Sequence, residues 1–377
     1  MNNTIKIICY GYRPNTAWTN RFIAYAKALA SLGKKVVFIF LIPDNNRSKL
    51  DIDIPNIECI YLWQTDGPLC RKIKLLSYIK NRFSLRKHIE NGDVCFFSDA
   101  SGFFLHEVKF YKKQIKIVFE STEHPEIFKR YFSKKIGLAI YYRKLSKVDN
   151  LLVISSSLKE HYVAKGFNAD KINVVNMFVD TSRFEGLRKT ESQKYIAYCG
   201  SVGCNKDGVD ILIKSFAQFI QMCPEYKLYI YGTGPVSEMT YLSELCNRLN
   251  VGSSVIFTGK VSYEIMPQKL MNASILALSR PNNKQNQYGF PTKLGEYLAT
   301  GNPVVVTYVG EIPNYIIDGE NGYIALPDSV DSFAQKLLQA ANDLEQGKNV
   351  GLCGKQLVQS VFSSNVQVES AISVFSI

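Results

Sequence analysis

The chain has 377 residues, 46% of them hydrophobic and 21% charged, a globular composition that excludes a disordered or fibrous protein. That length exceeds one ordinary core and suits two domains. The net charge of +12 lies in the first half, where residues 1–188 hold 31 Lys and Arg against 17 Asp and Glu.

The sequence indicates no membrane-spanning or exported protein. Its first residues are typical of a β-strand rather than of a signal peptide, and no stretch approaches the ~18 apolar residues that cross a bilayer. The nine cysteines are scattered without a Cys-x-x-Cys pair, which fits a reducing compartment. Four histidines without ligand spacing argue against zinc. We expect a cytoplasmic protein.

Short apolar runs alternate with amphipathic stretches along both halves of the chain. The first half predicts a helix at Thr19–Leu32 and strands at Ile5–Cys9, Val36–Leu41, Val94–Ser98 and Ile115–Glu120. The second half predicts strands at Tyr195–Cys199, Lys227–Tyr231, Val255–Thr258, Ile275–Leu278, Pro303–Tyr308 and Tyr323–Leu326. This alternation is typical of parallel strands joined by helical crossovers.

The predicted fold class is therefore α/β, with two doubly wound, Rossmann-like domains facing a cleft. We expect domains at 1–186 and 187–377, joined by the segment from Val179 to Lys194, with the last helix packing back on the first domain. Ligands of open parallel sheets bind beyond the carboxyl ends of the strands, so the cleft is the expected site.

Two segments of the first half are strongly basic. Cations interleave with apolar and aromatic residues at helical spacing over 71–87 and over 129–147. This pattern is expected of a helix lying on an anionic membrane surface, at the inner face of the membrane. A solvated basic face is the equally acceptable alternative. No nucleic-acid-binding module accompanies the charge.

The most informative segment runs from Arg280 to Pro303. It predicts a strand end, a glycine-bearing loop, and a helix with Pro291 near its start and Gly301 just past its end. A helix N-terminus offers free amide groups and a partial positive charge, which suit a pyrophosphate. Glu296, about one turn into the helix, is placed to accept hydrogen bonds from vicinal ribose hydroxyls.

A second constellation follows the predicted strand Tyr195–Cys199. Gly200 and Gly203 let the backbone approach an anion closely, and Lys206 can reach that anion with its ammonium group. Glycine turns of this kind occur in any doubly wound protein, so this signal is weak without the first.

Together these residues resemble the group 1 family of retaining glycosyltransferases with the GT-B fold. The match is strongest in Tyr288–Val306 and Gly200–Phe216, and it continues through Gly232-Thr233-Gly234 to Asp318-Gly319-Glu320-Asn321-Gly322. The resemblance implies a nucleoside diphosphate sugar as donor, no cofactor and no metal, and it assigns Glu296 to the ribose. Tyr288 replaces the first Glu of the family motif, so the expected carboxylate contact to the donor sugar is missing.

The resemblance also places the groups that hold the donor. Lys206 matches the family's diphosphate-binding Lys, whereas Ser201 stands at the position of its Arg. Arg280 either restores that lost charge or pairs with a surface acid. The remaining donor-binding positions implied by the motif are Gly200, Tyr288, Gly289, Phe290, Pro291 and Thr292. Thr16 and Ala17 replace the glycine pair after the first strand, and Asn20 or Arg21 is expected to point into the cleft on the acceptor side.

For the acceptor side the resemblance points to His124, with Glu123 as the alternative if the register shifts by one. A histidine at a strand end can donate a hydrogen bond to a substrate hydroxyl or take its proton; the competing reading is a polar loop that caps the next helix. The Asp-x-Asp pattern Asp51-Ile52-Asp53 lies far from the pyrophosphate loop and is interpreted as a solvated turn.

The sequence thus predicts a metal-independent glycosyltransferase that moves a sugar to a saccharide or lipid-linked hydroxyl acceptor in cell-surface polysaccharide or glycolipid assembly. Lys206 is expected to meet the negative charge on the leaving diphosphate. Two alternatives stay open: a sugar-nucleotide epimerase or hydrolase of the same fold, and an inactive nucleotide-sugar-binding subunit.

Overall fold

The computed structural model describes residues 4–44, 46–67, 69, 74–99, 101–102, 105, 108, 114–127 and 136–376. Its contacts divide the chain into two compact units, Met1–Asn176 with Ser364–Ile377, and Met177–Ser363. This division falls ten residues before the expected boundary at 186/187, because residues 177–186 pack with the second unit, and the C-terminal segment joins the first unit.

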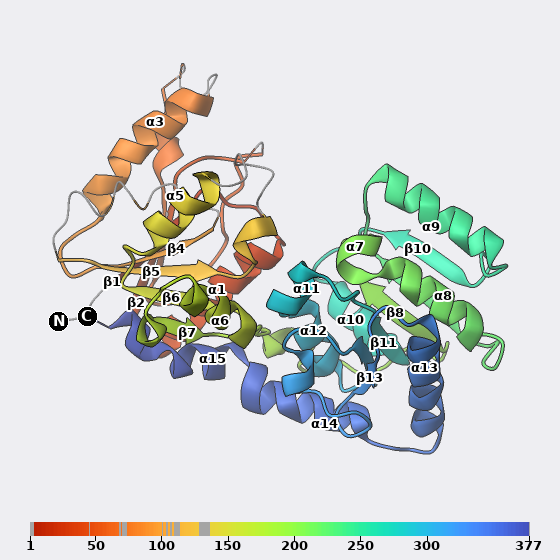
Figure 1. Ribbon diagram of the computed structural model, residues 1–377. Coiled ribbons are helices and arrows are strands. Elements are labelled where there is room, and N and C mark those ends of the chain that lie inside the picture. The colour runs from red at the N-terminus through yellow and green to blue at the C-terminus, as the bar shows by residue number, and fades with distance from the viewer. Residues whose placement is uncertain are drawn as a thin grey trace. The chain divides into compact units, whose positions relative to one another are not determined.

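In the first unit, the described residues form a parallel sheet in the order β3-β2-β1-β4-β5-β6-β7 (Figure 1). The strands are β1 (Thr4–Cys9), β2 (Lys35–Phe40), β3 (Ile57–Tyr61), β4 (Val94–Ser98), β5 (Lys116–Ser121), β6 (Asn150–Val153) and β7 (Ile172–Val174). The helices are α1 (Ala17–Ser31), α3 (Lys74–Leu85), α5 (Ile136–Leu145), α6 (Ser156–Ala164) and α15 (Ser364–Ser370). The central strands are buried on both faces, which explains why they are apolar runs rather than alternating patterns.

The C-terminal segment completes the core of the first unit. Helix α15 packs on α1, and the Gln367 side chain accepts a hydrogen bond from the amide of Asn176 at 2.8 Å. The ring of Phe375 is fully buried and lies 5.2 Å from that of Phe96 and 6.2 Å from that of Tyr25. The last residues are therefore part of the hydrophobic core around β4 and α1.

The second unit has its own parallel sheet, in the order β10-β9-β8-β11-β12-β13 among the described residues. Its strands are β8 (Tyr195–Cys199), β9 (Lys227–Tyr231), β10 (Val255–Gly259), β11 (Ile275–Leu278), β12 (Val304–Thr307) and β13 (Tyr323–Ala325). Its helices are α7 (Cys204–Asp207), α8 (Val209–Phe219), α9 (Val236–Arg248), α10 (Met266–Asn272), α11 (Lys284–Tyr288), α12 (Thr292–Thr300), α13 (Val330–Glu345) and α14 (Val350–Leu357), with a π-helical turn at Val358–Phe362.

Strand order reverses at β8 and β11 in this sheet, and β9 and β12 lie outside them. The loops after β8 and β11 consequently leave the same carboxyl edge of the sheet in opposite directions, the position where open α/β sheets bind ligands. In Figure 1, α7, α11 and the start of α12 gather near this edge. Both sheets of the predicted α/β fold are confirmed.

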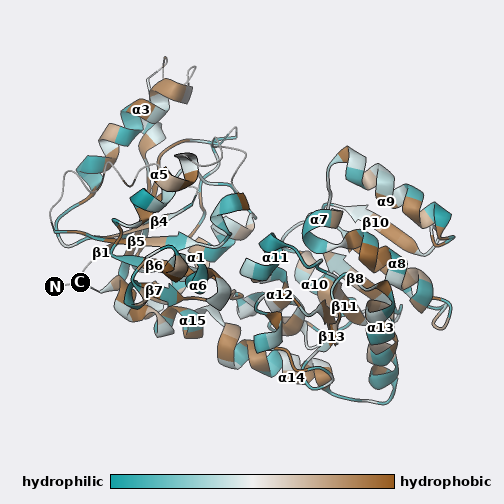
Figure 2. Ribbon diagram, in the orientation of Figure 1, coloured by the Kyte–Doolittle hydropathy of each residue, from teal (hydrophilic) through white to brown (hydrophobic). Residues whose placement is uncertain are grey.

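No helix among the described residues is long and apolar enough to cross a membrane. Hydropathy varies within most helices (Figure 2), as expected of helices with one face against a sheet.

Candidate functional site

The site in the second unit is organised around Asp207, the last residue of α7. Its buried carboxylate accepts hydrogen bonds from Lys293 Nζ at 2.6 Å, Tyr198 Oη at 2.8 Å and Arg280 Nε at 3.2 Å. Burial alone would raise the pKa of Asp207, but Lys293 and Arg280 outweigh it and lower that pKa to about 2. Two cations therefore surround one carboxylate, which leaves a net positive charge at the carboxyl edge of the sheet.

Arg280 forms an ion pair with the buried Asp207 rather than with a surface acid. Its expected role in restoring the lost positive charge stays a prediction. Its carbonyl oxygen accepts a hydrogen bond from Thr307 at 2.7 Å, which ties the loop after β11 to the end of β12. Arg280 is thus held rigidly beside the loop after β8.

Lys293, which the sequence analysis did not select, lies against the glycine loop after β8. A Cβ on Gly200 would come within 2.2 Å of Lys293 Nζ, and the φ angle of Gly200 is +156°. The residue must therefore be glycine for the ammonium group to rest against the loop backbone. Burial lowers the pKa of Lys293, and the Asp207 carboxylate opposes that shift. The signal in the sequence is the Lys that follows Pro291-Thr292 at the start of α12.

Side-chain amides join the loops after β8 and β11. Asn286 donates to the carbonyl of Lys206 at 2.9 Å and to that of Pro281 at 2.8 Å, and Asn283 donates to the carbonyl of Asn205 at 2.6 Å. Ser201 and Lys206 have exposed side chains. The backbone around Lys206 is therefore fixed, while its side chain lies at the surface.

The predicted segment before α12 is mostly buried. Phe290 stacks on Tyr315 with ring centroids 5.6 Å apart, and Gly289 is buried, whereas Tyr288 is half-buried. Pro291 is the N-cap residue and Thr292 the first residue of α12, so the helix begins where the sequence predicted. Its other end is closed by Gly301 with a φ of +79°. The first amides of α12 thus face the same edge as Lys293.

Glu296 is engaged by an arginine that the sequence analysis placed in the linker. Arg183, in the 3-10 turn Thr181–Phe184, forms an ion pair with Glu296 Oε1. Its other terminal nitrogen donates to the carbonyl of Tyr263 at 2.8 Å, and the guanidinium lies 3.6 Å from the centroid of the Tyr263 ring. The Glu296 carboxylate is partly exposed rather than turned into the apolar interior.

In the first unit, Arg21 lies inside the domain instead of pointing outward. Its guanidinium donates to Glu120 and to the carbonyls of Val175 and Asn176, each at 2.9 Å. Glu120 and Arg21 are both buried. A guanidinium with these partners holds α1 and the residues after β7 to β5; the acceptor role expected of Arg21 stays a prediction.

The other predicted residues near α1 are half-buried. Thr16 is the N-cap of α1, and its hydroxyl accepts a hydrogen bond from the amide of Thr19 at 3.3 Å. The amide of Asn20 donates a hydrogen bond to the Thr16 carbonyl at 2.9 Å.

Asp51 and Asp53 are exposed in the loop before β3, as expected of a solvated turn.

His124 is buried and its ring nitrogens have partners within the first unit. The amide of Glu126 lies 3.2 Å from Nδ1, and Nε2 lies 3.2 Å from Nδ1 of His161. His161 in turn contacts the hydroxyl of Tyr142 at 2.9 Å. Since an amide can only donate, His124 Nδ1 accepts and its Nε2 carries the proton toward His161. His161, expected to be structural, is therefore part of a hydrogen-bonded chain with His124, whereas Glu123 lies half-buried beside it.

A further carboxyl group, missed by the sequence analysis, follows β4. Asp99 accepts a hydrogen bond from Tyr141 at 2.7 Å and a longer one from Ser121 at 3.4 Å. Burial, with Glu120 and Glu123 nearby, raises the pKa of Asp99 to about 7 although the Tyr141 hydrogen bond opposes the shift. Perturbed carboxyl groups of this kind are concentrated at functional sites.

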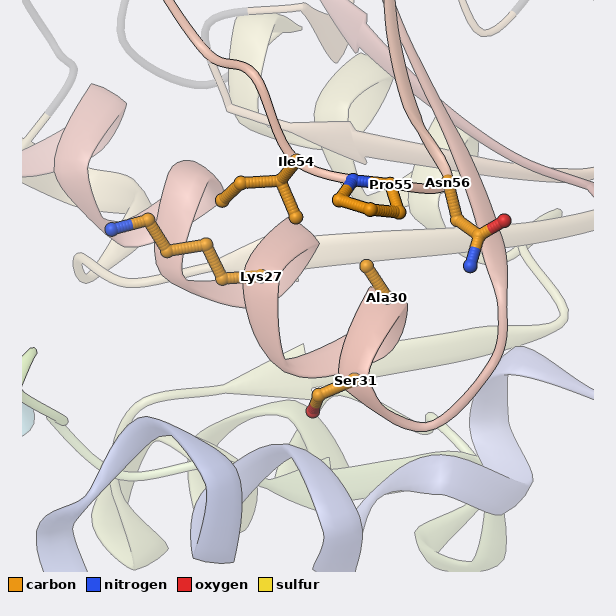
Figure 3. Close-up of a pocket in the computed structure, with 6 residues that line it drawn as sticks. All are labelled: Lys27, Ala30, Ser31, Ile54, Pro55 and Asn56. Carbon is orange, nitrogen blue, oxygen red and sulfur yellow. The ribbon is translucent and has the colours of Figure 1, made fainter.

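The first unit also has a shallow hollow between the end of α1 and the loop before β3 (Figure 3). It is lined by Lys27, Ala30, Ser31, Ile54, Pro55 and Asn56. With a single titratable side chain, this hollow offers no constellation for chemistry.

Comparison with known proteins agrees with this geometry. Residues 193–343 match the family described as "Glycosyl transferases group 1". An uncharacterized glycosyltransferase of Methanocaldococcus jannaschii, MJ1607, is 26% identical over 52% of this chain and 52% of its own length. The capsular polysaccharide biosynthesis glycosyltransferase CapM of Staphylococcus aureus is 24% identical over 60% of this chain and 61% of its own. The chain thus spans little more than half of these curated relatives.

Among solved structures, a variant of S. aureus TarM in complex with fondaparinux, alpha-GlcNAc-glycerol and UDP superimposes with a TM-score of 0.76. The two sequences are 12% identical, and the superposition covers 100% of both chains. At this identity the likeness concerns the fold alone. The two parallel sheets of this chain match the fold of the GT-B proteins. Residues 193–343 are similar to the group 1 glycosyltransferases, the family that the sequence analysis named.

Proposed function

We propose that the protein is a glycosyltransferase that moves a sugar from a nucleoside diphosphate sugar to a hydroxyl group, with retention of anomeric configuration. The observation that carries this proposal is the pair of cations, Lys293 and Arg280, fixed by one buried carboxylate beside the Gly200 loop. Glycosyl transfer passes through an oxocarbenium-like state, while negative charge builds on the departing diphosphate. Cations and hydrogen-bond donors that are held in place before the reaction stabilise such charge most effectively.

The charged side chains of the second unit are then proposed to bind different parts of the donor. The diphosphate occupies the edge where Lys293 meets the Gly200 loop, facing the first amides of α12, whose dipole favours an anion. The exposed ammonium of Lys206 adds a third cation. Glu296 keeps one carboxylate oxygen for Arg183 and offers the other to the ribose hydroxyls.

The acceptor is proposed to be a saccharide or a lipid-linked saccharide in the assembly of a cell-surface polysaccharide or glycolipid. The names of CapM and of the ligands bound to TarM support this class. The basic first unit is proposed to contact an anionic membrane, where such acceptors are held. Within that unit, the chain His124–His161 and the carboxyl group of Asp99 are the candidates for contact with an acceptor hydroxyl.

The proposal is tested by transfer of labelled sugar from a panel of nucleoside diphosphate sugars. Lys206→Ala and Glu296→Ala are each expected to lower transfer by about tenfold or more, the size of effect of losing a single interaction worth ~1.4 kcal/mol. Matched controls are Lys227→Ala, at the amino end of β9, and Glu345→Ala, on an exposed ion pair. Near-normal turnover in both site variants would refute the assignment.

Two rival functions give different outcomes in the same assay. An epimerase or hydrolase of this fold consumes the donor without an acceptor, so product analysis with donor alone separates it from a transferase. An inactive binding subunit binds the nucleotide sugar tightly in calorimetry and turns over no acceptor. Acceptor-dependent product is the result expected here.

A further inference from the structure

Helix α3 (Lys74–Leu85) of the first unit has an unusual distribution of polar and apolar side chains. The face packed against the domain carries Ser77 and Asn81, both buried. Ser77 donates to Asp66 at 2.5 Å, and Asn81 donates to the carbonyl of Leu41 at 2.9 Å. Ser77 and Asn81 are thus buried and hydrogen-bonded against the domain instead of facing water.

The opposite positions of α3 are large and apolar. Leu75, Ile79 and Phe83 follow one another at intervals of four residues, which places them on one stripe of the helix. They are 63%, 43% and 52% exposed. Figure 2 shows brown residues interspersed with teal ones along α3, and in Figure 1 the helix extends away from the sheet of its own unit. Leu85 is also fully buried, so the inner side of the helix is mixed while its outer stripe is apolar. Such a stripe is informative, because isolated exposed apolar residues are common but an ordered stripe is not.

Cations border this stripe. Arg82 precedes Phe83 in the sequence, and Arg86 and Lys87 come after it. The guanidinium of Arg86 lies 4.6 Å from the centroid of the Phe83 ring. Between residues 74 and 89 the sequence contains no Asp or Glu. Apolar side chains flanked by Lys and Arg match the boundary between the acyl chains and the headgroups of an anionic bilayer. Residues 71–73 of this basic segment, and 129–135 of the second one, lie outside the described residues.

We propose that the stripe Leu75, Ile79 and Phe83 docks on an anionic lipid bilayer, with the flanking cations at the headgroups. The alternative occupant, a second copy of the chain, would bring together two halves that each hold 31 Lys and Arg against 17 Asp and Glu, and like charges disfavour that association. This stripe specifies the surface for the membrane contact proposed above, and its test does not depend on whether glycosyl transfer is found.

The test is sedimentation of the full chain with vesicles of phosphatidylcholine mixed with phosphatidylglycerol, and with vesicles of phosphatidylcholine alone, in the absence of nucleotide. The full chain is expected to bind the anionic vesicles, and less so as salt is added. The double variant Ile79→Ser, Phe83→Ser is expected to bind about tenfold or more weakly, since two large apolar side chains no longer enter the bilayer. The matched control is Met222→Ser, Val236→Ser, at positions 73% and 83% exposed in the second unit.

Two results would overturn the proposal. One is vesicle binding that depends neither on the stripe nor on lipid charge, seen as unchanged binding by the double variant or as equal binding to neutral and anionic vesicles. The other is a dimer of the full chain in analytical ultracentrifugation that the double variant abolishes, which would identify a second copy as the occupant. A thermal shift with UDP, measured on the same proteins, reports folding and donor binding separately, so the loss of vesicle binding and the failure of the proposed function are distinguishable.

Discussion

Arg183 and Glu296 are 113 residues apart in the sequence, and their contact links the start of the second unit to the helix that carries the nucleotide site. The guanidinium holds Glu296 Oε1, the carbonyl of Tyr263 and the face of the Tyr263 ring at once. A carboxylate with one oxygen fixed in this way has few orientations left. If Glu296 binds the ribose as proposed, Arg183 is expected to act as a positioning residue through Glu296.

This role predicts a specific pattern of kinetic effects. Arg183→Gln is expected to raise KM for the donor about tenfold and to change kcat less, because the ribose contact is made before and during transfer. In a Glu296→Gln background the same substitution is expected to have little further effect, since coupled residues are not additive. Lys194→Gln, which breaks an exposed ion pair with Glu345, is the control. Additive effects of the two substitutions would indicate that Arg183 acts independently of Glu296.

Asp99 gives a pH dependence whose sign follows from its environment. Burial, together with Glu120 and Glu123, raises its pKa to about 7 in the folded chain, whereas an unfolded Asp titrates near 3.9. The folded state therefore binds the proton more tightly, and the contribution of Asp99 to stability is present at low pH and is lost as the pH rises from about 4 through about 7.

Asp99→Asn removes this titration and keeps a polar partner for Tyr141. When the pH is raised from about 5 to about 8, across the folded pKa of Asp99, the free energy of unfolding is expected to fall less in the variant than in the parent chain. Urea unfolding of both proteins at the two pH values measures the difference, and Asp51→Asn, at an exposed position, serves as the control. An identical pH dependence for the parent and Asp99→Asn would show that Asp99 does not titrate in this range.

At the scale of elements, most strands of both sheets were predicted, and β3, β6 and β7 were not. Strands β8, β9 and β11 have the bounds expected from their continuous apolar runs. The sequence analysis placed no strand at β3, whose pattern is interrupted by the exposed Glu58, and the three-residue β7 gives too short a pattern to be detected. Length alone does not separate the two groups, because β11 has four residues and was predicted whereas β3 has five.

The candidate site shows the same limit for individual side chains. The glycine loop and the start and end of α12 could be predicted because they depend on neighbours in sequence, as the caps Pro291 and Gly301 show. The position of Lys293 at the start of α12 was a signal in the sequence, but its contact with Gly200 could not be predicted. The contacts of Arg183 with Glu296 and of Arg21 with Glu120 could not be predicted either, because the partners lie 113 and 99 residues apart. The roles assigned to the remaining site residues stay predictions.

At the scale of the whole molecule, each of the two units has its own hydrophobic core. A substitution in one core therefore tests the stability of that unit. Phe375, at the C-terminal end, is buried in the first unit against Phe96 and Tyr25. The proposed nucleotide site, by contrast, is built entirely from the second unit, Met177–Ser363. A perturbation of either core should therefore be assignable to one unit in a calorimetric scan of the full chain.

Phe375→Ala is expected to destabilise the first unit by about 3–5 kcal/mol, the usual cost of a large aromatic deletion in a core, and to lower one of two thermal transitions. A nucleoside diphosphate that binds only the folded second unit is expected to raise the other transition, by about 2.7 kcal/mol of stability at a hundredfold excess over Kd. Since the two effects arise in different cores, UDP should raise its transition equally in the parent chain and in Phe375→Ala. If UDP instead raised the transition that Phe375→Ala lowers, the nucleotide site would have to be sought in the first unit, and the tasks proposed for Lys293 and Glu296 would be wrong.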